Sequence, residues 1–561
     1  MDEERLLTYH RFTREHGVNR PLYWLARLLL VPFFFVYFRL VRIGREHGRV
    51  TGPLIVVANH RSFLDPFVIG ASLPWRRPLH YVAKVELFER RWLGWILNRL
   101  GAYPVRRGQS DDQTLITSRQ VLERGGAICI FPEGTRHRTG SLGRPKRGFG
   151  RLALETGAAV LPVAVHGTEQ VRRGWRIRPK KVRVRMGRAL TFPRTEDPSP
   201  ALANSVGARV WPVIELQWEW LGGLPPLRKA AVIGAGSWGT AVAVLLARGG
   251  LDVQLGTRTE ERAEEMNETR TNESYLPGIE LPESLTVKRA AEIELAGIDL
   301  VCLAVPSAAL PQAVGAIGDR VGQRASVLLL SKGMVAPMAA LPSEYVSERV
   351  RARAIASLGG PAHAKEAVSG TAALVLGSRD PDLRDQLGSV FDEAGLVCER
   401  SEDMIGVEVA GAAKNAAALA GAAAQAQGMN AAGIATAQVW RECVAYALAR
   451  GAQHETFAGI AGVGDLTATI LAEGSRNRRA GELLGQGTPA EQIPGIIGQA
   501  SEALDSVPLI AEAVRKSGMG SSALDGLSGL IAGEISPGEW MAMVRQAERL
   551  RREPAAGGRA A

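Results

Sequence analysis

A histidine and an aspartate stand five residues apart, directly after an apolar run in the first quarter of the chain. His60 follows Leu54–Ala58, which has the composition of a buried strand, and Asp65 is the next acid. A carboxylate can accept a proton from one ring nitrogen of a histidine and leave the other nitrogen free as a base. Such a base activates a hydroxyl group as a nucleophile. By itself the pair is a weak signal, because a histidine after a strand is more often structural.

A second group of polar residues ends another apolar run, Ala127–Phe131. The motif F-P-E-G-T-R contributes Glu133, Gly134 and Arg136, and Arg106 follows G-A-Y-P-V earlier in the chain. The planar guanidinium of arginine matches the oxygens of a phosphate. Each charge alone could be a local salt bridge or a surface residue, but the whole set predicts a site for an anionic substrate.

A glycine-rich turn of a different kind follows the apolar run Lys229–Ile233. A helical pattern and a second strand, Asp252–Leu255, come after the turn, which is the context in which such glycines hold a pyrophosphate. Arg258 stands where a site for NAD usually carries an acid, so the sequence favours NADP, although a plain surface arginine is an alternative. The turn itself comprises Gly234, Gly236, Ser237, Trp238 and Gly239.

Two lysines stand in apolar surroundings in the second half of the chain. Lys332 follows the apolar run Val327–Leu330, and Lys414 lies in a helical stretch of alanine and glycine. An ammonium group is costly to bury without partners, so each lysine either reaches solvent or has a function.

The excess of positive over negative charge is confined to the first part of the chain. Residues 1–227 hold 37 Lys and Arg against 18 Asp and Glu, and the remainder holds 31 against 39. Such an excess suits an anionic membrane surface or phosphorylated substrates. We do not expect nucleic acid as a partner, since no motif for it is present. The four cysteines are scattered singly, which predicts neither a metal site nor a disulfide framework and is typical of a reducing cytoplasm.

The most apolar segment, Leu22–Ile43, is interrupted by Arg27, Arg39 and Arg42 and by Pro32, which we expect to break it. Its uncharged run is too short to span a bilayer, for which about 20 apolar residues are needed. Basic flanks and interleaved aromatic residues favour a helix that lies in the membrane interface. An ordinary buried helix is the alternative, and a cleaved signal peptide is not expected.

Alternating strands and helices, followed by helices alone, predict the organisation of the chain. We expect an α/β domain, then a Rossmann α/β dinucleotide-binding domain, then an all-α substrate domain. The predicted parts are an interfacial segment (1–45), the first α/β domain (46–221), a linker (222–228), the Rossmann domain (229–401), the helical domain (402–549) and a disordered tail (550–561).

Residues 20–220 resemble the glycerolphosphate acyltransferase family, specifically its 1-acyl-sn-glycerol-3-phosphate acyltransferases. Four motifs occur in the family's order: N-H-x-x-x-x-D at 59–65, G-A-Y-P-V-R ending at Arg106, F-P-E-G-T-R at 131–136, and V-L-P-V at 160–163. The resemblance implies that His60 is the general base and Asp65 its orienting carboxylate. It implies a substrate-binding set of Arg106, Glu133, Gly134 and Arg136. A fatty acyl thioester, on coenzyme A or acyl carrier protein, would be the donor.

Residues 228–549 resemble the NAD(P)-dependent glycerol-3-phosphate dehydrogenases. The matching motifs are GAGSWGTA, YLPG, AVPS, SKG, GGPAHA, GAAKN, GVGDL and SRNRR. The resemblance implies that Lys414 transfers a proton opposite the hydride of NADPH or NADH, and that Lys332 contacts both substrate and cofactor. The other implied substrate-binding residues are Gly360, Asp465, Ser475, Arg476 and Asn477. The implied cofactor-binding residues are those of the glycine-rich turn with Arg258, Ala364, Arg476 and Glu502. No metal is implied.

The chain departs from the dehydrogenase pattern in two places. Ala362 replaces a substrate-contacting hydroxyl, with His363 after it, and S-E-A-L at 501–504 replaces V-E-G-Y. A degenerate, nucleotide-sensing domain that regulates the acyltransferase is therefore an alternative. We expect an active dehydrogenase, because both lysines, Asp465 and the SRN run are intact.

The two resemblances together predict one bifunctional enzyme of phospholipid precursor synthesis. One half would reduce dihydroxyacetone phosphate to sn-glycerol 3-phosphate. The other would acylate lysophosphatidate or glycerol 3-phosphate, and the motifs leave this choice open. We expect a cytoplasmic protein that associates peripherally with the inner face of the cell membrane, whose surface is anionic. A homodimer is one possible assembly.

Overall fold

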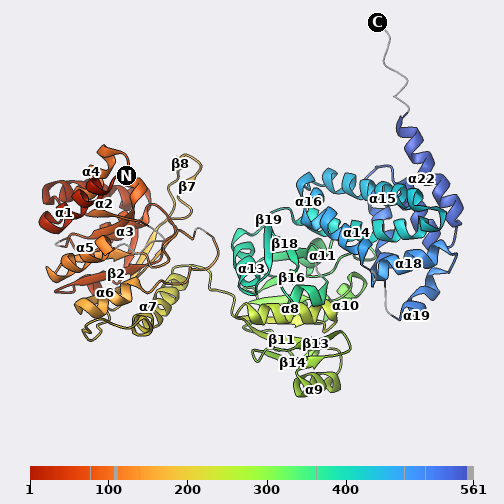
Figure 1. The fold of residues 1–561 in the computed structure, drawn as a ribbon, viewed down its shortest axis with the longest axis horizontal. Helices are drawn as coiled ribbons and strands as arrows, with labels where there is room; N and C mark the ends of the chain where they lie inside the picture. The colour runs from red at the N-terminus through yellow and green to blue at the C-terminus, as the bar shows by residue number, and fades with distance from the viewer. Residues whose placement is uncertain are drawn as a thin grey trace, which may run out of the picture. The chain divides into compact units, whose positions relative to one another are not determined.

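The computed structural model describes residues 1–75, 77–106, 112–137, 139–361, 363–472, 474–498 and 501–552. The chain divides into two compact units, Met1–Pro226 and Leu227–Ala561 (Figure 1). The division falls in the segment Gly222–Leu227, whose glycines and prolines suit a connection between units. Each unit has hydrophobic cores of its own.

A seven-stranded sheet forms the centre of the first unit, in the order β1-β9-β6-β2-β5-β3-β4. Neighbouring strands run parallel except β6 and β9, which are antiparallel. The α/β class predicted for this region is confirmed. The strands are β1 (Val41–Ile43), β2 (Leu54–Ala58), β3 (His80–Lys84), β4 (Ala102–Val105), β5 (Ala127–Ile130), β6 (Ala159–His166) and β9 (Arg183–Met186).

Both faces of this sheet are covered by helices, which explains why the central strand is apolar throughout. Leu54, Val56 and Ala58 of β2 belong to one core, and Ile55 and Val57 belong to the other. The helices are α1 (Glu3–His16), α2 (Arg20–Tyr37), α3 (Asp65–Ser72), α4 (Arg91–Arg99), α5 (Asp112–Glu123), α6 (Gly148–Thr156) and α7 (Pro200–Trp220). Residues of α2 and α3 pack in the first core, and residues of α5, α6 and α7 pack in the second.

Helix α2 differs in two ways from the segment that the sequence predicted. It ends at Tyr37 and not at Ile43, because Arg39 takes a left-handed conformation (φ 47°) and Val41–Ile43 turns into strand β1. Pro32 does not break the helix but lies inside it on an exposed side, where a missing N–H is cheap because water reaches the freed carbonyl. The helix has one buried side, formed by Tyr23, Arg27, Val31 and Phe34.

An eight-stranded sheet begins the second unit, in the order β14-β11-β10-β15-β16-β17-β18-β19. Only β17 and β18 are antiparallel among its neighbouring pairs. The strands are β10 (Lys229–Ile233), β11 (Asp252–Thr257), β14 (Leu285–Arg289), β15 (Leu300–Leu303), β16 (Ser326–Leu329), β17 (Ile355–Gly359), β18 (Ala373–Gly377) and β19 (Val397–Ser401). Helices α8 (Ser237–Arg248), α9 (Glu260–Thr269), α10 (Leu310–Ile317), α11 (Pro342–Arg349), α12 (Ala364–Val368) and α13 (Pro381–Glu393) accompany them, so the predicted Rossmann class is confirmed.

From Met404 onward the described residues form helices without a strand, as predicted. Helix α14 (Met404–Ala424) is buried along almost its whole length. Small residues let its neighbours approach closely, since a Cβ at Gly481, on the neighbouring helix α18, would lie 2.3 Å from the carbonyl oxygen of Leu419 in α14. The surrounding helices are α15 (Met429–Ala449), α16 (His454–Ala458), α17 (Asp465–Leu471), α18 (Arg476–Gly485), α19 (Ile493–Ile497), α20 (Glu502–Lys516), α21 (Ser522–Ile531) and α22 (Pro537–Arg552).

All four cysteines are buried in these cores as free thiols. Cys129 lies in β5, Cys302 in β15, Cys398 in β19 and Cys443 in α15.

Two candidate active sites

The ring of His60 is held in a defined orientation at the end of β2. Its Nδ1 lies 2.9 Å from Oδ2 of Asp65. Its face stacks on Phe131, with ring centroids 4.2 Å apart. Oδ2 of Asp65 accepts the hydrogen bond from Nδ1–H, which assigns the hydrogen to that nitrogen and leaves Nε2 as the basic atom. The geometry therefore suits a general base.

Asp65 is fully buried at the first residue of α3 and uses both of its oxygens. Besides His60, Oδ2 accepts the backbone N–H groups of Arg61 (2.6 Å) and Ser62 (2.7 Å). Oδ1 accepts the hydroxyl of Thr168 at 2.6 Å. These donors compensate for the burial of a carboxylate and fix its position. Thr168 is a member of the site that the sequence did not indicate, because it lies 103 residues further along the chain.

Glu133 lies in the same site, but its carboxylate is occupied by the protein itself. Oε1 accepts the backbone N–H of His60 at 2.7 Å, and Oε2 accepts that of Gly143 at 2.8 Å. Burial raises the pKa of Glu133 to about 7, although both backbone donors favour the ionised form. In this state Glu133 holds the loop of His60 in place, and its predicted contact with substrate stays a prediction.

The predicted arginines are placed differently from each other. Arg136 points its Nε at Nε2 of His60 at 3.4 Å and lines the cavity described below. Arg106 forms an ion pair with Glu3 of α1 at 2.7 Å and is not among the residues that line the cavity. Lys146, which no motif indicated, also lines the cavity. Its ammonium group lies beside Gly134, which has a positive φ of 75°.

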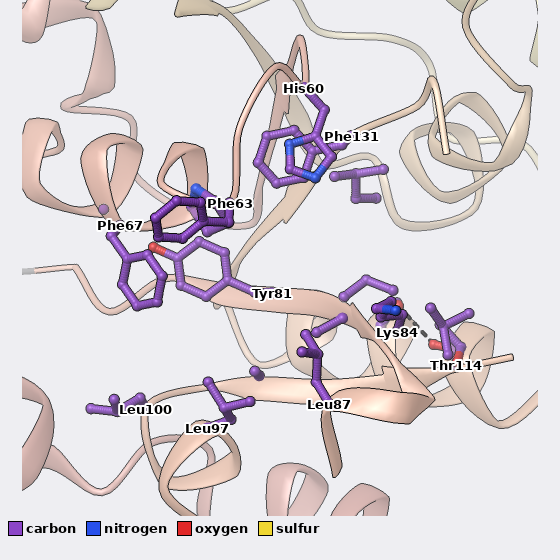
Figure 2. Close-up of a pocket in the computed structure, with 18 of the residues that line it drawn as sticks. His60, Phe63, Phe67, Tyr81, Lys84, Leu87, Leu97, Leu100, Thr114 and Phe131 are labelled. Atoms are coloured by element: carbon purple, nitrogen blue, oxygen red, sulfur yellow. Dashed lines mark hydrogen bonds between the residues drawn. The ribbon is translucent and has the colours of Figure 1, made fainter. Parts of the chain in front are cut away.

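A cavity of about 620 Å³ extends from His60 into the first unit. Figure 2 shows His60 and Phe131 together, with Phe63, Phe67 and Tyr81 beyond them and Leu87, Leu97 and Leu100 further away. Apart from the cations near His60, most of the wall is aliphatic or aromatic. The shape and lining suit a long apolar chain whose reactive end lies at His60.

The glycine-rich turn of the second unit lies between β10 and α8. Gly234 has a φ of 116°, and a Cβ there would lie 2.4 Å from the carbonyl oxygen of Ala304. At Gly239 a Cβ would lie 2.0 Å from the carbonyl oxygen of Gly234, so the helix could not pack against the strand. At Gly236 a Cβ would meet open space. The first glycine is thus needed for the turn, and the third for the packing of α8 against the strand. The second leaves room for a pyrophosphate at the N-terminus of α8, beside Ser237 and Trp238.

Arg258 is exposed directly after β11. The last residue of β11, Thr257, pairs with Arg289 at the end of β14, so a second cation stands at the same edge of the sheet. Glu292 lies 3.7 Å from Arg289. The end of these strands is where a Rossmann fold holds the ribose of the adenosine part.

The two predicted lysines meet at one carboxylate. Nζ of Lys332 lies 2.8 Å from Oδ2 of Asp465 and donates to the carbonyl of Gly360 at 3.1 Å. Nζ of Lys414 lies 3.2 Å from Oδ1 of Asp465 and donates to the hydroxyl of Thr469 at 2.9 Å. Residues from α14 and α17 and from the loops after β16 and β17 therefore form one polar cluster.

The charges of this cluster depend on one another. Burial and the neighbouring charge of Lys332 both lower the pKa of Lys414, Asp465 opposes them, and the result is a pKa of about 8. Burial raises the pKa of Asp465, but the two lysines outweigh this effect, so its pKa is lowered overall. Lys414 can therefore change its protonation state near neutral pH, as a proton-transferring residue must.

A second set of polar residues surrounds the lysines. The amide of Asn477 donates to Asn415, which in turn donates to the carbonyl of Lys332. Glu502 accepts the backbone N–H groups of Ser307 and Lys332. These bonds fix the loop that carries Lys332, a role that the motifs did not reveal.

The remaining predicted residues stand around this set. Ser475 caps α18 by accepting the N–H of Arg478, Arg476 opens that helix, and Ala364 begins α12. Ala362 lies outside the described residues, and His363 is exposed. Within the described residues no group of three or more metal-ligating side chains occurs.

A Rossmann sheet with a lysine cluster, in one chain with a histidine–aspartate site, defines a nucleotide-dependent dehydrogenase joined to an acyltransferase. The families described as NAD-dependent glycerol-3-phosphate dehydrogenase N-terminus and C-terminus match residues 229–383 and 403–542, and the acyltransferase family matches residues 40–166. The chain belongs to the NAD-dependent glycerol-3-phosphate dehydrogenase family and carries an acyltransferase domain ahead of the part that defines this membership. It is an enzyme with both catalytic parts, and NAD(P)H is the cofactor of the dehydrogenase part.

Individual relatives agree with this assignment. The glycerol-3-phosphate dehydrogenase (NAD(P)+) of Variovorax paradoxus is 36% identical over 327 residues, which cover 56% of this chain and 96% of that protein. The enzyme of the same name from Halalkalibacterium halodurans is 33% identical over 296 residues, covering 52% of this chain and 86% of that protein. The crystal structure of glycerol-3-phosphate dehydrogenase from Coxiella burnetii covers 58% of this chain and all of its own, with a TM-score of 0.53 and 28% identity.

Proposed function

We propose that the chain catalyses two reactions of glycerol phosphate. Its second unit reduces dihydroxyacetone phosphate to sn-glycerol 3-phosphate with NAD(P)H, and its first unit transfers a fatty acyl group to 1-acyl-sn-glycerol 3-phosphate or glycerol 3-phosphate. The observation that carries the proposal is the presence of two assembled proton-transfer sites in one chain. They are His60 held by Asp65, and Lys414 held by Asp465.

In acyl transfer, Nε2 of His60 removes the proton of the acceptor hydroxyl as its oxygen attacks the thioester carbonyl. The carbon–sulfur bond then breaks, and the proton passes to the thiolate of the leaving group. Asp65 stabilises the imidazolium that forms in between. Arg136 must turn from Nε2 to admit the hydroxyl, and together with Lys146 it offers positive charge to the acceptor's phosphate.

In reduction, the carbonyl carbon of dihydroxyacetone phosphate would take up the hydride that bound NAD(P)H supplies. Lys414 donates a proton to the carbonyl oxygen, and Asp465 positions its ammonium group. Lys332, fixed by Gly360 and Glu502, orients the substrate beside it. Ser475, Arg476 and Asn477 stand at the start of α18, where the N-terminus of a helix and a guanidinium suit a phosphate group.

The cations at the ends of β11 and β14 support NADPH over NADH. Arg258 and Arg289 would face the 2′-phosphate that distinguishes the two cofactors. Arg258→Asp should raise the KM for NADPH about tenfold or more and leave that for NADH unchanged or lower. Equal loss for both cofactors would point to a structural role for Arg258.

We further propose that the first unit lies on the cytoplasmic face of the cell membrane. Among the described residues, α2 is the one helix long and apolar enough by length and composition to cross a bilayer, and only 22% of its 18 residues are buried. The exposed side carries Leu25, Leu28, Leu29, Phe33 and Val36, while the opposite side packs on the sheet. A helix with one side packed and the other apolar and exposed suits the interface, where an apolar side inserts without crossing.

Joining the two parts would raise the concentration of glycerol phosphate near a membrane-bound acyltransferase. The alternative, a degenerate nucleotide-sensing domain, has no support in the cluster of Lys332, Lys414 and Asp465, which is complete. Measurable oxidation of NADPH with dihydroxyacetone phosphate would exclude that alternative.

One experiment tests the proposal as a whole. The purified chain receives vesicles, dihydroxyacetone phosphate, NADPH and a radiolabelled acyl thioester, either on coenzyme A or on acyl carrier protein. Label in lysophosphatidate would establish a two-step route from a ketose phosphate to a lipid. Label that enters lipid only after lysophosphatidate is added would make the first unit a second-acylation enzyme. Absence of NADPH oxidation would refute the dehydrogenase part, and absence of label under both conditions would refute the acyltransferase part.

A further inference from the structure

A small hairpin stands apart from the sheet of the first unit and carries an exposed tryptophan at its turn. Strands β7 (Arg172–Arg173) and β8 (Arg176–Ile177) pair only with each other, and Gly174 and Trp175 connect them. Gly174 has a φ of 59°, which a two-residue hairpin turn with glycine at its first position requires. Figure 1 shows β7 and β8 projecting from the body of this unit.

The hairpin contributes little to the core of the fold. Trp175 is 84% exposed, and Arg172, Arg176 and Ile177 are exposed as well. The guanidinium of Arg176 lies over the ring of Trp175, 5.3 Å from its centroid. A large apolar side chain that packs against so little of its own protein suggests a binding surface. Tryptophan is also the residue that prefers the boundary between water and lipid.

The charged residues in the sequence of the hairpin and the strand that follows it are all basic. Residues 172–188 contain nine Lys and Arg and no Asp or Glu. Arg176 and Lys180 are exposed. This surface is therefore complementary to an anionic one, and tryptophan among cations is the composition of a segment that binds anionic lipids.

The hairpin also continues the exposed side of α2. The hydroxyl of Tyr37, at the end of α2, donates to the carbonyl of Ile177 at 2.9 Å. Tyr37 stacks on the exposed Phe33, with centroids 5.1 Å apart. At its other side, Arg172 lies 5.8 Å from the ring of Phe63, which lines the cavity. The hairpin thus connects the apolar side of α2 with the wall of the acyl-chain cavity.

We infer that residues 172–181, the basic hairpin, form a second membrane contact that selects anionic lipid and holds the cavity toward the bilayer. Trp175 enters the interface between headgroups and acyl chains, and the cations around it bind phosphates of the lipid. This inference rests on the proposed membrane association, but it adds a lipid specificity that α2 does not provide, since the exposed side of α2 is apolar. Its partner is an anionic lipid surface.

The test measures binding of the full-length protein to vesicles of phosphatidylcholine, with and without phosphatidylglycerol. Trp175→Ala should weaken binding to the anionic vesicles about tenfold, and Arg176→Gln with Lys180→Gln should weaken it by about fivefold per charge. Binding to neutral vesicles should change little for the charge variant. Anionic vesicles should also protect the bonds after Arg176 and Lys180 of the wild type from trypsin, and added salt should remove this protection.

Matched controls separate the hairpin from general surface effects. Trp220→Ala removes a tryptophan that is 61% exposed on α7, and Arg209→Gln removes an exposed charge on the same helix. Both should bind as the wild type does. NADPH oxidation by the second unit, with circular dichroism, reports whether each variant is folded.

Each result decides a different claim. If hairpin variants bind anionic vesicles as tightly as the wild type, the inference about the hairpin is wrong while membrane association stands. If the wild type binds no vesicle of either composition, membrane association itself is wrong. A hairpin variant that changes the oligomeric mass by light scattering, and leaves vesicle binding intact, would show that the hairpin contacts a second copy and would also overturn the inference.

Discussion

Asp65 is the residue whose loss should separate chemistry from binding most clearly. Its Oδ2 accepts hydrogen bonds from three donors, including His60, and its Oδ1 accepts one from Thr168. Asp65→Asn keeps the size but turns one oxygen into a donor, so at least one partner loses its acceptor and His60 loses its fixed tautomer. We expect the kcat of acyl transfer to fall about 100-fold or more, which is the usual contribution of a general base to the rate.

The control for Asp65→Asn lies within the same molecule. Dehydrogenase activity belongs to the second unit and should be unchanged, and the KM for the acyl thioester should change little, because Asp65 is buried and is not among the residues that line the cavity. Unaltered acyl transfer in this variant would contradict the role of His60 as base.

Lys414 should give the dehydrogenase a pH dependence near its lowered pKa. Because burial lowers this pKa to about 8, the ammonium form predominates below pH 8 and is lost above it. Reduction needs the proton, so its kcat should fall as pH rises through about 8. Oxidation of glycerol 3-phosphate needs the neutral amine, so its kcat should rise over the same range. A stopped-assay pH profile in both directions measures this.

Asp465→Asn provides the check on that assignment. Asp465 raises the pKa of Lys414, so the variant should move both limbs of the profile to lower pH. A profile that keeps its midpoint, with only a lower maximum, would indicate that another group titrates.

Sequence could indicate the reacting residues better than their partners. The spacing from His60 to Asp65 predicted a hydrogen bond, and the two atoms lie 2.9 Å apart. Thr168 carries no local signal, since the fold alone brings it to Asp65. The sequence predicted both Glu133 and Arg106 as substrate ligands. A motif cannot show that Glu133 accepts the backbone N–H of His60 or that Arg106 forms an ion pair with Glu3.

At the scale of elements, the glycines of the turn before α8 should separate folding from cofactor binding. Gly236→Ala places its Cβ in open space, so the Tm should not change while the Kd for NADPH rises about tenfold, equivalent to about 1.4 kcal/mol. Gly239→Ala puts a Cβ 2.0 Å from a carbonyl oxygen, and we expect a loss of about 2 kcal/mol of stability from such overpacking.

Thermal unfolding and fluorescence titration with NADPH measure the two effects. One outcome would contradict this prediction. If both variants lose stability equally, Gly236 is a structural glycine and the space beside it does not belong to the cofactor. The same titration with NADH serves as a second reading of the site.

Strands were more predictable than the segment around α2. Leu54–Ala58 and Lys229–Ile233 were predicted with the bounds that the structure shows, because strands buried on both faces are continuous apolar runs. In Leu22–Ile43 the apolar run continues past the end of the helix, and only the backbone reversal at Arg39 separates α2 from β1. Composition does not encode that reversal, since arginine seldom adopts a positive φ.

For the whole molecule, two units with separate cores predict two separable activities. Protease cleavage engineered into Gly222–Pro226 should leave NADPH oxidation at its original rate and acyl transfer at its original rate with saturating acceptor. Coupled flux from dihydroxyacetone phosphate to lipid should fall on cleavage if tethering concentrates the intermediate. Equal coupled flux before and after cleavage would count against any benefit of the fusion beyond joint expression.

The burial of all four thiols has a consequence for the chemistry that the chain tolerates. Burial raises the pKa of Cys398 to about 12 and raises those of Cys129, Cys302 and Cys443 as well, so almost no thiolate is present at neutral pH. Thiolate is the form that peroxide and alkylating reagents attack. Both activities should therefore survive thiol-directed reagents without a protecting reductant, and a cysteine introduced on the surface would be the one reactive thiol for a spectroscopic label.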